Sequence, residues 1–350
     1  MKKVFFFSIS IVFVIVNISM TFNLPNSRKA YNEKISNYAF FKGNIKEQIP
    51  DDRVYYYELN APLFSDYARK LRFVHLPAGN IVNYNPDSVF QFPVGTSIIK
   101  TFYYLNDERN EAKGRRLIET RVLLHEEDGW KSLPYIWNEE QTEAYLEVAG
   151  GSTEVSFKNQ NGERKQLSYS VPNMNQCKSC HERNGSMTPI GPSARQLNGT
   201  IAFNGENDNQ LSHWAKQGIL NMLPSNVDEI PKLANYTDPS IDIDMRARAY
   251  LDINCAHCHN KAGQAQTSGL YLDWRNTDKT AYGFYKTPIA AGRGSGDLKY
   301  DILPGKPDES ILLHRMKSTD PGVMMPELSR SLVHNEGVEL IREWIKGMKK

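Results

Sequence analysis

The chain has four cysteines, and all of them belong to two copies of the pentapeptide C-x-x-C-H. The copies are Cys177-Lys178-Ser179-Cys180-His181 and Cys255-Ala256-His257-Cys258-His259. This spacing is typical of a c-type haem attachment site, in which both thiols bond the porphyrin and the histidine ligates the iron. The sequence therefore predicts two haem c groups. Cys177, Cys180, Cys255 and Cys258 are the expected tethers, and His181 and His259 the expected proximal ligands.

Two other kinds of site use paired cysteines. A Cys₄ zinc site would require both pairs to converge on one ion, and it gives no role to the histidine after each second cysteine. A disulfide across two intervening residues is strained and more typical of a redox site. Both alternatives stay open beside the haem interpretation.

The composition is that of a folded protein of two or three domains. The chain has 350 residues, of which 40% are hydrophobic and 23% charged, well outside the range of disordered chains. Its net charge of +2 gives no electrostatic argument for nucleic acid, so no DNA or RNA partner is expected.

Residues 1–22 have the form of a secretory signal. Lys2 and Lys3 precede an apolar run from Val4 to Met20, as a basic segment precedes the hydrophobic core of a signal peptide. No small-x-small cleavage site follows, so an uncleaved membrane anchor is the alternative. Covalent haem is attached outside the cytoplasm, and the sequence predicts a periplasmic protein.

The first half of the mature chain is expected to be rich in strands. Residues 23–50 are expected to form a polar lead-in, and residues 51–171 a β-sandwich-like or open-barrel domain. Strands are predicted at 97–104 and 118–124, the latter half-buried, and residues 154–158 and 167–171 form a hairpin around Asn161-Gly162. One short helix is placed within 138–148.

The second half is expected to carry the haems on helices. Residues 172–238 form the first haem region and 239–350 a domain like class I cytochrome c. Helices are predicted at 207–220, 244–254 and 335–348 from apolar residues at helical spacing. The predicted fold class is multidomain α+β, with a β-sandwich-like domain followed by mainly α-helical cytochrome c-like domains.

Methionines in loops are candidates for the far side of each iron. Met325, before Pro326, is the expected sixth ligand of the second haem, with Met324 as its competitor; ligation by Met and His raises a haem's reduction potential. For the first haem the choice stays open, and an iron without a sixth protein ligand is a further alternative. The candidates there are Met174, Met187, His213 and Met222.

Two other features are weaker. His257 cannot reach the iron that His259 ligates, and it is interpreted as a solvated or supporting residue. Gly292-Arg293-Gly294-Ser295-Gly296-Asp297 lacks the Lys-Ser/Thr ending of a phosphate-binding loop. Arg293 is instead a candidate partner for a haem propionate.

Several longer segments resemble a family of bacterial di-haem cytochromes. The resemblance rests on the stretches 246–259, 291–296, 304–307 and 324–328, and on 92–96 and 133–138 in the N-terminal half. It covers about residues 50–350. It implies haem c and electron transfer, and it implies no substrate.

Two functions follow from these motifs. In the first, the protein is an electron carrier that passes electrons from a donor, for example a periplasmic dehydrogenase, through both haems to an acceptor. In the second, one haem is open and the protein is a peroxidase-like or oxidase enzyme. The enzyme hypothesis lacks an acid–base pair beside His181, where Glu182 is the nearest carboxylate in the sequence. A haem-based sensor is a third, minor alternative.

Overall fold

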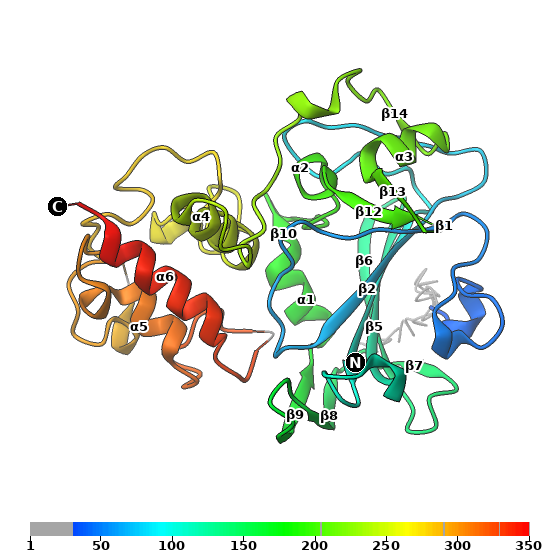
Figure 1. Ribbon diagram of the computed structural model, residues 1–350, viewed down its shortest axis with the longest axis horizontal. Coiled ribbons are helices and arrows are strands. Elements are labelled where there is room, and N and C mark those ends of the chain that lie inside the picture. The colour runs from blue at the N-terminus through cyan, green and yellow to red at the C-terminus, as the bar shows by residue number, and fades with distance from the viewer. Residues whose placement is uncertain (1–30, 204, 290, 329, 350) are drawn as a thin grey trace, which may run out of the picture. The chain divides into compact units, whose positions relative to one another are not determined.

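The computed structural model describes residues 31–349 except 204, 290 and 329 (Figure 1). Residues Asn32–Lys350 form one compact unit, and the predicted boundaries at 171/172 and 238/239 stay a prediction. The predicted signal or anchor, residues 1–22, lies outside the described residues. Among those described, no helix is both long and apolar enough to cross a bilayer.

One six-stranded sheet is the largest element of the structure. All its neighbouring strands are antiparallel, and their order is β1-β2-β4-β5-β6-β7. The central strands are rich in β-branched and aromatic residues, which favour this pairing. The strands are β1 Val54–Tyr56, β2 Arg69–His75, β4 Ser97–Leu105, β5 Arg115–Glu126, β6 Gly129–Trp137 and β7 Ala144–Leu146.

Both faces of this sheet are covered. Phe73 packs edge-on against Phe41 on one face, so part of the expected polar lead-in belongs to the core. The prediction that β5 is half-buried was wrong, because Glu119 and Thr120 on its two faces are both 0% exposed. Glu119 tolerates burial because Arg121 pairs with it.

A hairpin packs on the other face of the sheet. Strands β8 (Gly151–Lys158) and β9 (Arg164–Val171) pair as the sequence predicted. Phe157 and Tyr169 pack on Tyr104 and Phe102 of β4. The remaining strands form two-residue or four-residue pairs: β3 Val82–Asn83 with β14 Leu220–Asn221, β10 Glu182–Arg183 with β11 Ser186–Met187, and β12 Thr200–Phe203 with β13 Glu206–Asn209.

The predicted fold class was wrong, because the part expected to be mainly helical is not. Helices account for 23% of the described residues and strands for 27%. Between the two pentapeptides the chain forms short strand pairs and turns, such as the β10–β11 turn at Asn184-Gly185, where both residues have positive φ. The helices are α1 Met174–His181, α2 Ala194–Leu197, α3 Gln210–Lys216, α4 Ile243–Asn254, α5 Ile311–Lys317 and α6 Asn335–Gly347, with 3₁₀ turns at 35–38, 45–47, 111–113, 227–229, 266–268, 292–295 and 307–309.

The individual element predictions had mixed outcomes. The helices at 244–254 and 335–348 are confirmed as α4 and α6, and the strands at 97–104 and 118–124 as β4 and β5. The helix at 207–220 is shorter, because 206–209 pair as β13. The helix placed in 138–148 was wrong, since Ala144–Leu146 pair with β6.

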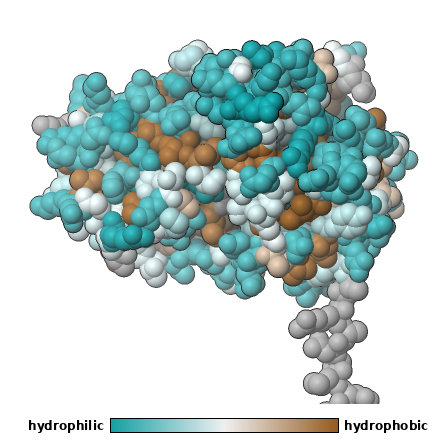
Figure 2. Space-filling view, turned by 90° about the horizontal axis from the view of Figure 1, so that it is seen from below, coloured by the Kyte–Doolittle hydropathy of each residue, from teal (hydrophilic) through white to brown (hydrophobic). Residues whose placement is uncertain are grey.

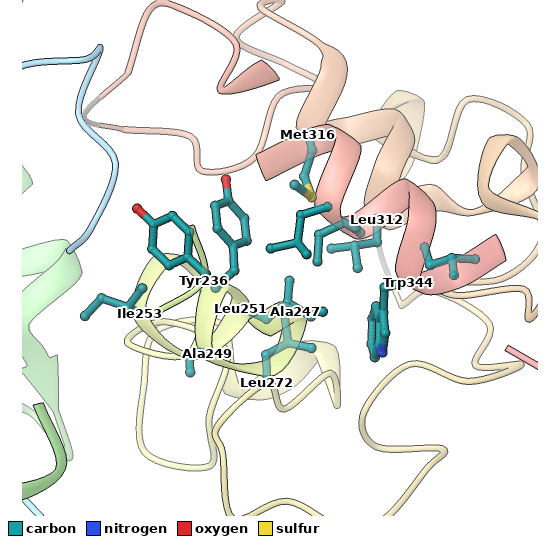
Figure 3. Packing of buried hydrophobic residues seen from close by; sticks show 14 of the residues in the cluster. Tyr236, Ala247, Ala249, Leu251, Ile253, Leu272, Leu312, Met316 and Trp344 are labelled. Atoms are coloured by element: carbon teal, nitrogen blue, oxygen red, sulfur yellow. The ribbon is translucent and has the colours of Figure 1, made fainter. Parts of the chain in front are cut away.

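Helices α4, α5 and α6 enclose the core of the C-terminal part (Figure 3). Ala247 and Leu251 of α4 are fully buried, as is Ile341 of α6. Trp344 packs in the same core and its indole N–H donates to Asp244 Oδ1 at 2.8 Å. The buried indole therefore has a hydrogen-bond acceptor, and the two helices are joined by both apolar and polar contacts.

A segment between β1 and β2 ties the sheet to the C-terminal part. The Asp66 carboxylate accepts hydrogen bonds from the backbone N–H groups of Ser331 and Leu332 at 2.8 to 2.9 Å. The Phe64 N–H donates to Asn254 Oδ1 at 2.9 Å. These bonds fix the end of α4, and hence the start of the second pentapeptide, relative to the sheet.

The surface is that of an ordinary globular protein. On the face shown in Figure 2, hydrophilic residues dominate and hydrophobic ones form small patches between them. Large hydrophobic residues such as Met222 and Ile289 are exposed, and exposed hydrophobic side chains are normal on the surface of a folded protein.

The crossing of α4 and α6 depends on Gly337. A Cβ built at this position would collide with the ring and hydroxyl of Tyr250, which is itself buried. We expect Gly337→Ala to lower the free energy of unfolding by about 1–3 kcal/mol through overpacking. Denaturant titration of the purified protein measures this change.

Gly347, at the end of the same helix, provides the control. A Cβ there has no neighbour within 4 Å, so Gly347→Ala should leave stability unchanged or raise it by up to about 1 kcal/mol. Equal losses in the two variants would show that the close contact with Tyr250 is not what selects glycine at position 337.

Candidate functional site

The two pentapeptides meet at one cavity of about 400 Å³. This volume is in the range of pockets that bind cofactors and drug-sized ligands. Strands of the large sheet form one wall, and α4 with the 325–338 segment forms another. Its lining includes Cys177, Cys180, His181, Cys255, His257, Met316, Met325 and His334. It also includes eight cationic side chains, among them Arg72, Lys100, Arg121, Arg195 and Arg330, and the three aspartates Asp87, Asp252 and Asp273.

The first pentapeptide forms the last turns of α1. This short helix begins with a capping box, in which the Asn173 side chain accepts from Gln176 N–H and the Gln176 side chain accepts from Asn173 N–H. Cys177 is 5% exposed, and burial raises the pKa of its thiol. The cap therefore fixes where the first tether enters the cavity wall.

The ring of His181 is oriented by the backbone. Its Nδ1 lies 3.1 Å from the carbonyl oxygen of Thr188, and because a carbonyl can only accept, Nδ1 carries the proton. Burial lowers the pKa of His181 to about 4, so the ring is neutral at pH 7. Nε2 then presents a lone pair, which is the form that ligates a metal.

The second pentapeptide follows directly after α4. Cys255 caps the helix, and burial raises the pKa of its thiol to about 12. His259 Nδ1 lies 3.5 Å from Ser268 Oγ, and burial lowers its pKa to about 4. Unlike His181, neither His259 nor Cys258 is part of the cavity lining.

The pentapeptides touch through their second cysteines. The ligand atoms of Cys180, His257 and Cys258 all lie within 4.8 Å of one another. The hydrogen bond from Cys258, helped by one from His257, lowers the pKa of the Cys180 thiol to about 4, and the same contact raises the pKa of Cys258. Of the two interpretations of His257, the solvated one was wrong, because the residue is 7% exposed, whereas a supporting role agrees with its place beside both cysteines.

Few of the predicted distal ligands reach the cavity. Met325 lines it, whereas Met324 is buried elsewhere. The lining includes none of the candidates for the first haem. His213 stacks on Phe203 and contacts Gln217 and Asp208, and Met222 is 70% exposed; Met174 and Met187 also lie outside the lining.

Sequence reasoning missed the cationic side chains of the cavity and, among other lining residues, Met316 and His334. Met316 lies on α5 and His334 directly precedes α6. His334 stacks on Phe64 with ring centroids 4.2 Å apart, and its Nδ1 lies 3.1 Å from the Tyr250 hydroxyl. The sequence signal that could have found His334 is the helical periodicity of residues 335–348, because a helix fixes the position of the residue that directly precedes it.

Unpaired cationic atoms test whether a haem fits this cavity. Arg195 Nη1 and Arg330 Nε are buried without a hydrogen-bond partner among the described residues, and both side chains line the cavity. A buried donor without an acceptor is costly. The carboxylates of haem propionates are hydrogen-bond acceptors with a charge opposite to that of a guanidinium. Together with thiols on both sides, these residues fit the group.

The prediction that Arg293 pairs with a haem propionate was wrong. Its guanidinium pairs with Asp320 at 2.8 Å, it is 69% exposed, and it lies outside the cavity lining. The glycines around it form a 3₁₀ turn at the surface. The arginines that do reach the cavity come from separate parts of the sequence.

No family model, no curated protein and no solved structure matches this chain. The resemblance to bacterial di-haem cytochromes is contradicted by this result and by the sheet-dominated fold, in which the cysteines and histidine that come together are Cys180, His257 and Cys258. What remains is the chemistry of the two pentapeptides and of the cavity where they meet.

The depressed pKa of Cys180 is testable in the chain produced without haem. Because Cys180 is a thiolate and Cys177 a thiol, iodoacetamide at about pH 6 should alkylate Cys180 roughly tenfold faster. Peptide mass spectrometry measures both rates. In the control His257→Ala, the onset of Cys180 reactivity should move to higher pH; identical pH profiles for the two cysteines would contradict the pairing.

Burial of His334 makes stability depend on pH. Its pKa falls to about 4 on folding, mainly through burial, whereas an unfolded chain has a His pKa of about 6.5. The unfolded chain therefore binds the proton first, and up to about 3 kcal/mol of stability is lost as the pH falls from about 6.5 to 4. Denaturant titrations of wild type and His334→Phe, which keeps the stacking, should differ in slope over this range and run parallel above it.

Proposed function

We propose that the chain is an exported electron carrier with two covalently bound haem c groups. The observation that carries this proposal is the convergence of both C-x-x-C-H pentapeptides on one cavity. The buried guanidinium nitrogens of its wall that have no hydrogen-bond partner among the described residues support the proposal, because haem brings carboxylates. A bound haem supplies a one-electron couple at its iron.

Each pair of cysteines would tether one group. The thiol sulfur forms a bond to one vinyl carbon while its hydrogen goes to the other, so no oxidant is needed. Cys177 and Cys180 would hold the first group, and Cys255 and Cys258 would hold the second. Since Cys180 and Cys258 adjoin, the tethered edges of the two groups would be close, which favours electron transfer between them.

Other residues in and around the cavity would tune the site. The Thr188 carbonyl fixes the tautomer of His181, and the half-buried His259 is neutral at pH 7. Met325 presents a thioether to the cavity and is proposed as the sixth ligand at the second haem. The protein sets the potentials through ligands, burial and nearby charge.

The proposed compartment is the periplasm, with redox proteins as partners. Residues 1–22 have the composition of a signal or anchor, and haem c is attached outside the cytoplasm. No nucleic-acid partner is proposed, since the net charge of the chain is +2.

Haem content tests the function directly. The protein should be produced together with the c-type maturation machinery, and its haem quantified as the pyridine haemochrome and by intact mass. We expect two covalent haems per chain and one in Cys177→Ala/Cys180→Ala. A wild-type chain without covalent haem would contradict the proposal.

Met325 and Met324 form a matched pair of variants. Because Met/His ligation raises the potential, Met325→Leu should lower the reduction potential of one haem and open its iron to carbon monoxide. Met324→Leu, at a buried position outside the cavity lining, should leave potential and spectrum unchanged. Potentiometric titration measures the reduction potential, and the Soret band reports the ligation of the iron. If the Met325→Leu variant has wild-type potentials and spectrum, Met325 is a packing residue and not a ligand.

A second candidate is a metal site at the contact between the pentapeptides. Cys180, His257 and Cys258 are close enough to share one ion, and thiolate and imidazole are zinc ligands. This candidate leaves Cys177 and Cys255 without a role. One zinc per chain, no iron, and loss of zinc in His257→Ala would favour it over haem.

A peroxidase-like or oxidase enzyme is the third candidate, since none of the predicted distal ligands for the first haem lines the cavity. Titration of the reduced wild-type protein with carbon monoxide separates it from the carrier. No spectral change means that both irons are six-coordinate, as a carrier requires. Binding at one haem together with peroxide turnover would favour the enzyme.

A further inference from the structure

Three cationic side chains form one row across the large sheet. Arg72 on β2 is paired in register with Lys100 on β4, and Lys100 with Arg121 on β5. Directly paired residues point to the same face of a sheet. All three side chains line the cavity, together with Ile98 and Leu123 from the same face.

Only one end of this row is neutralised by the protein. Arg121 forms two bonds to Glu119, at 2.9 and 2.5 Å, and the Tyr169 hydroxyl donates to the same carboxylate at 2.6 Å. Glu119 is therefore fully engaged by the Arg121 end.

Arg121 forms an ion pair, whereas the other two cations form none with any residue that the structure describes. Arg72 is 7% exposed and its Nη2 has no hydrogen-bond partner among the described residues. Lys100 forms no hydrogen bond or ion pair with any of those residues, and its Nζ lies 4.7 Å above the Phe102 ring. Burial and the charges of Arg72 and Arg121 hold the pKa of Lys100 well below its usual range.

This arrangement is unfavourable unless an anion occupies the cavity. Like charges directly opposite on neighbouring strands destabilise a sheet, and each buried ion without a partner costs several kcal/mol. Burial of unpaired charge at a cavity is the pattern of a binding site rather than of a structural core. The missing partner must be anionic and must reach Arg72 from within the cavity.

The position of the first tether relates the row to one haem. Cys177 lines the cavity beside Ser132 of β6 and Arg121, whereas Arg72 is on β2, three strands away in the order β2-β4-β5-β6. Three strand spacings are about 14 Å, comparable with the width of a substituted porphyrin. The propionates of a haem project from the edge opposite to its thioether bonds.

We infer that Arg72 and Lys100 bind the propionate carboxylates of the haem tethered at Cys177 and Cys180. This inference rests on the proposed function. It gives the sheet a role in the site itself: the sheet forms the floor on which the first haem lies, and its cations neutralise the far edge of that haem.

The test uses the haem-loaded protein with Arg72→Met and Lys100→Met, which keep side-chain length and remove the charge. Loss of a cation beside a propionate favours the ferric state, so each variant should have a lower reduction potential at one haem. We expect the electron-transfer equilibrium constant of that haem to change about tenfold, which corresponds to ~59 mV for a one-electron couple. Haem content should stay at the wild-type value. Lys131→Met, on β6 and outside the cavity lining, is the control and should change neither potential.

Each further outcome decides one of the two proposals. Wild-type potentials in both variants, with normal haem content, would overturn the propionate assignment and leave the proposed function standing. If the potentials of the wild-type protein shift with inorganic phosphate at constant ionic strength, the row of cations is open to free anions. That result would also overturn the propionate assignment. Absence of covalent haem from the wild type would overturn the proposed function, and this inference with it.

Discussion

Buried positive charge is the constraint on which the arrangement of this molecule depends. The sheet carries the buried Arg72 and the half-buried Lys100, which form no ion pair with any described residue, and Arg195 and Arg330 present nitrogens without a hydrogen-bond partner to the same cavity. A protein core does not gain stability from such groups. On the function proposed above, the cavity and the elements around it bind an anionic group that neutralises these cations.

The sheet and the C-terminal helices contribute to this cavity in different ways. The sheet supplies charge at fixed register, while α1 and α4 each deliver a cysteine pair at a helix end. Asp66 and Asn254 hold these parts together through hydrogen bonds to backbone groups distant in the chain. The position of each thiol thus depends on contacts that lie outside its own pentapeptide.

Local patterns predicted the elements, and long-range contacts decided the site. Helices α4 and α6 follow from apolar residues at helical spacing, and the β8–β9 hairpin from alternation around Asn161-Gly162. The 206–209 segment became a strand because it pairs with β12, which no local preference shows. The approach of Cys180 to Cys258 and the row from Arg72 to Arg121 join residues far apart in sequence, so periodicity could not reveal them.

The order of these elements along the chain has a consequence for biogenesis. On the function proposed above, the chain is exported N-terminus first, so the strands of the sheet, within residues 54–146, would emerge before the second pentapeptide. Until haem is attached, the folded sheet would lack the stabilisation that the ligand gives. A ligand that binds the native form and not the unfolded form raises stability. Cells that fail to load the protein would then degrade it, because unloaded chains open more often to proteases. Its abundance would report the supply of haem as well as the rate of its own synthesis.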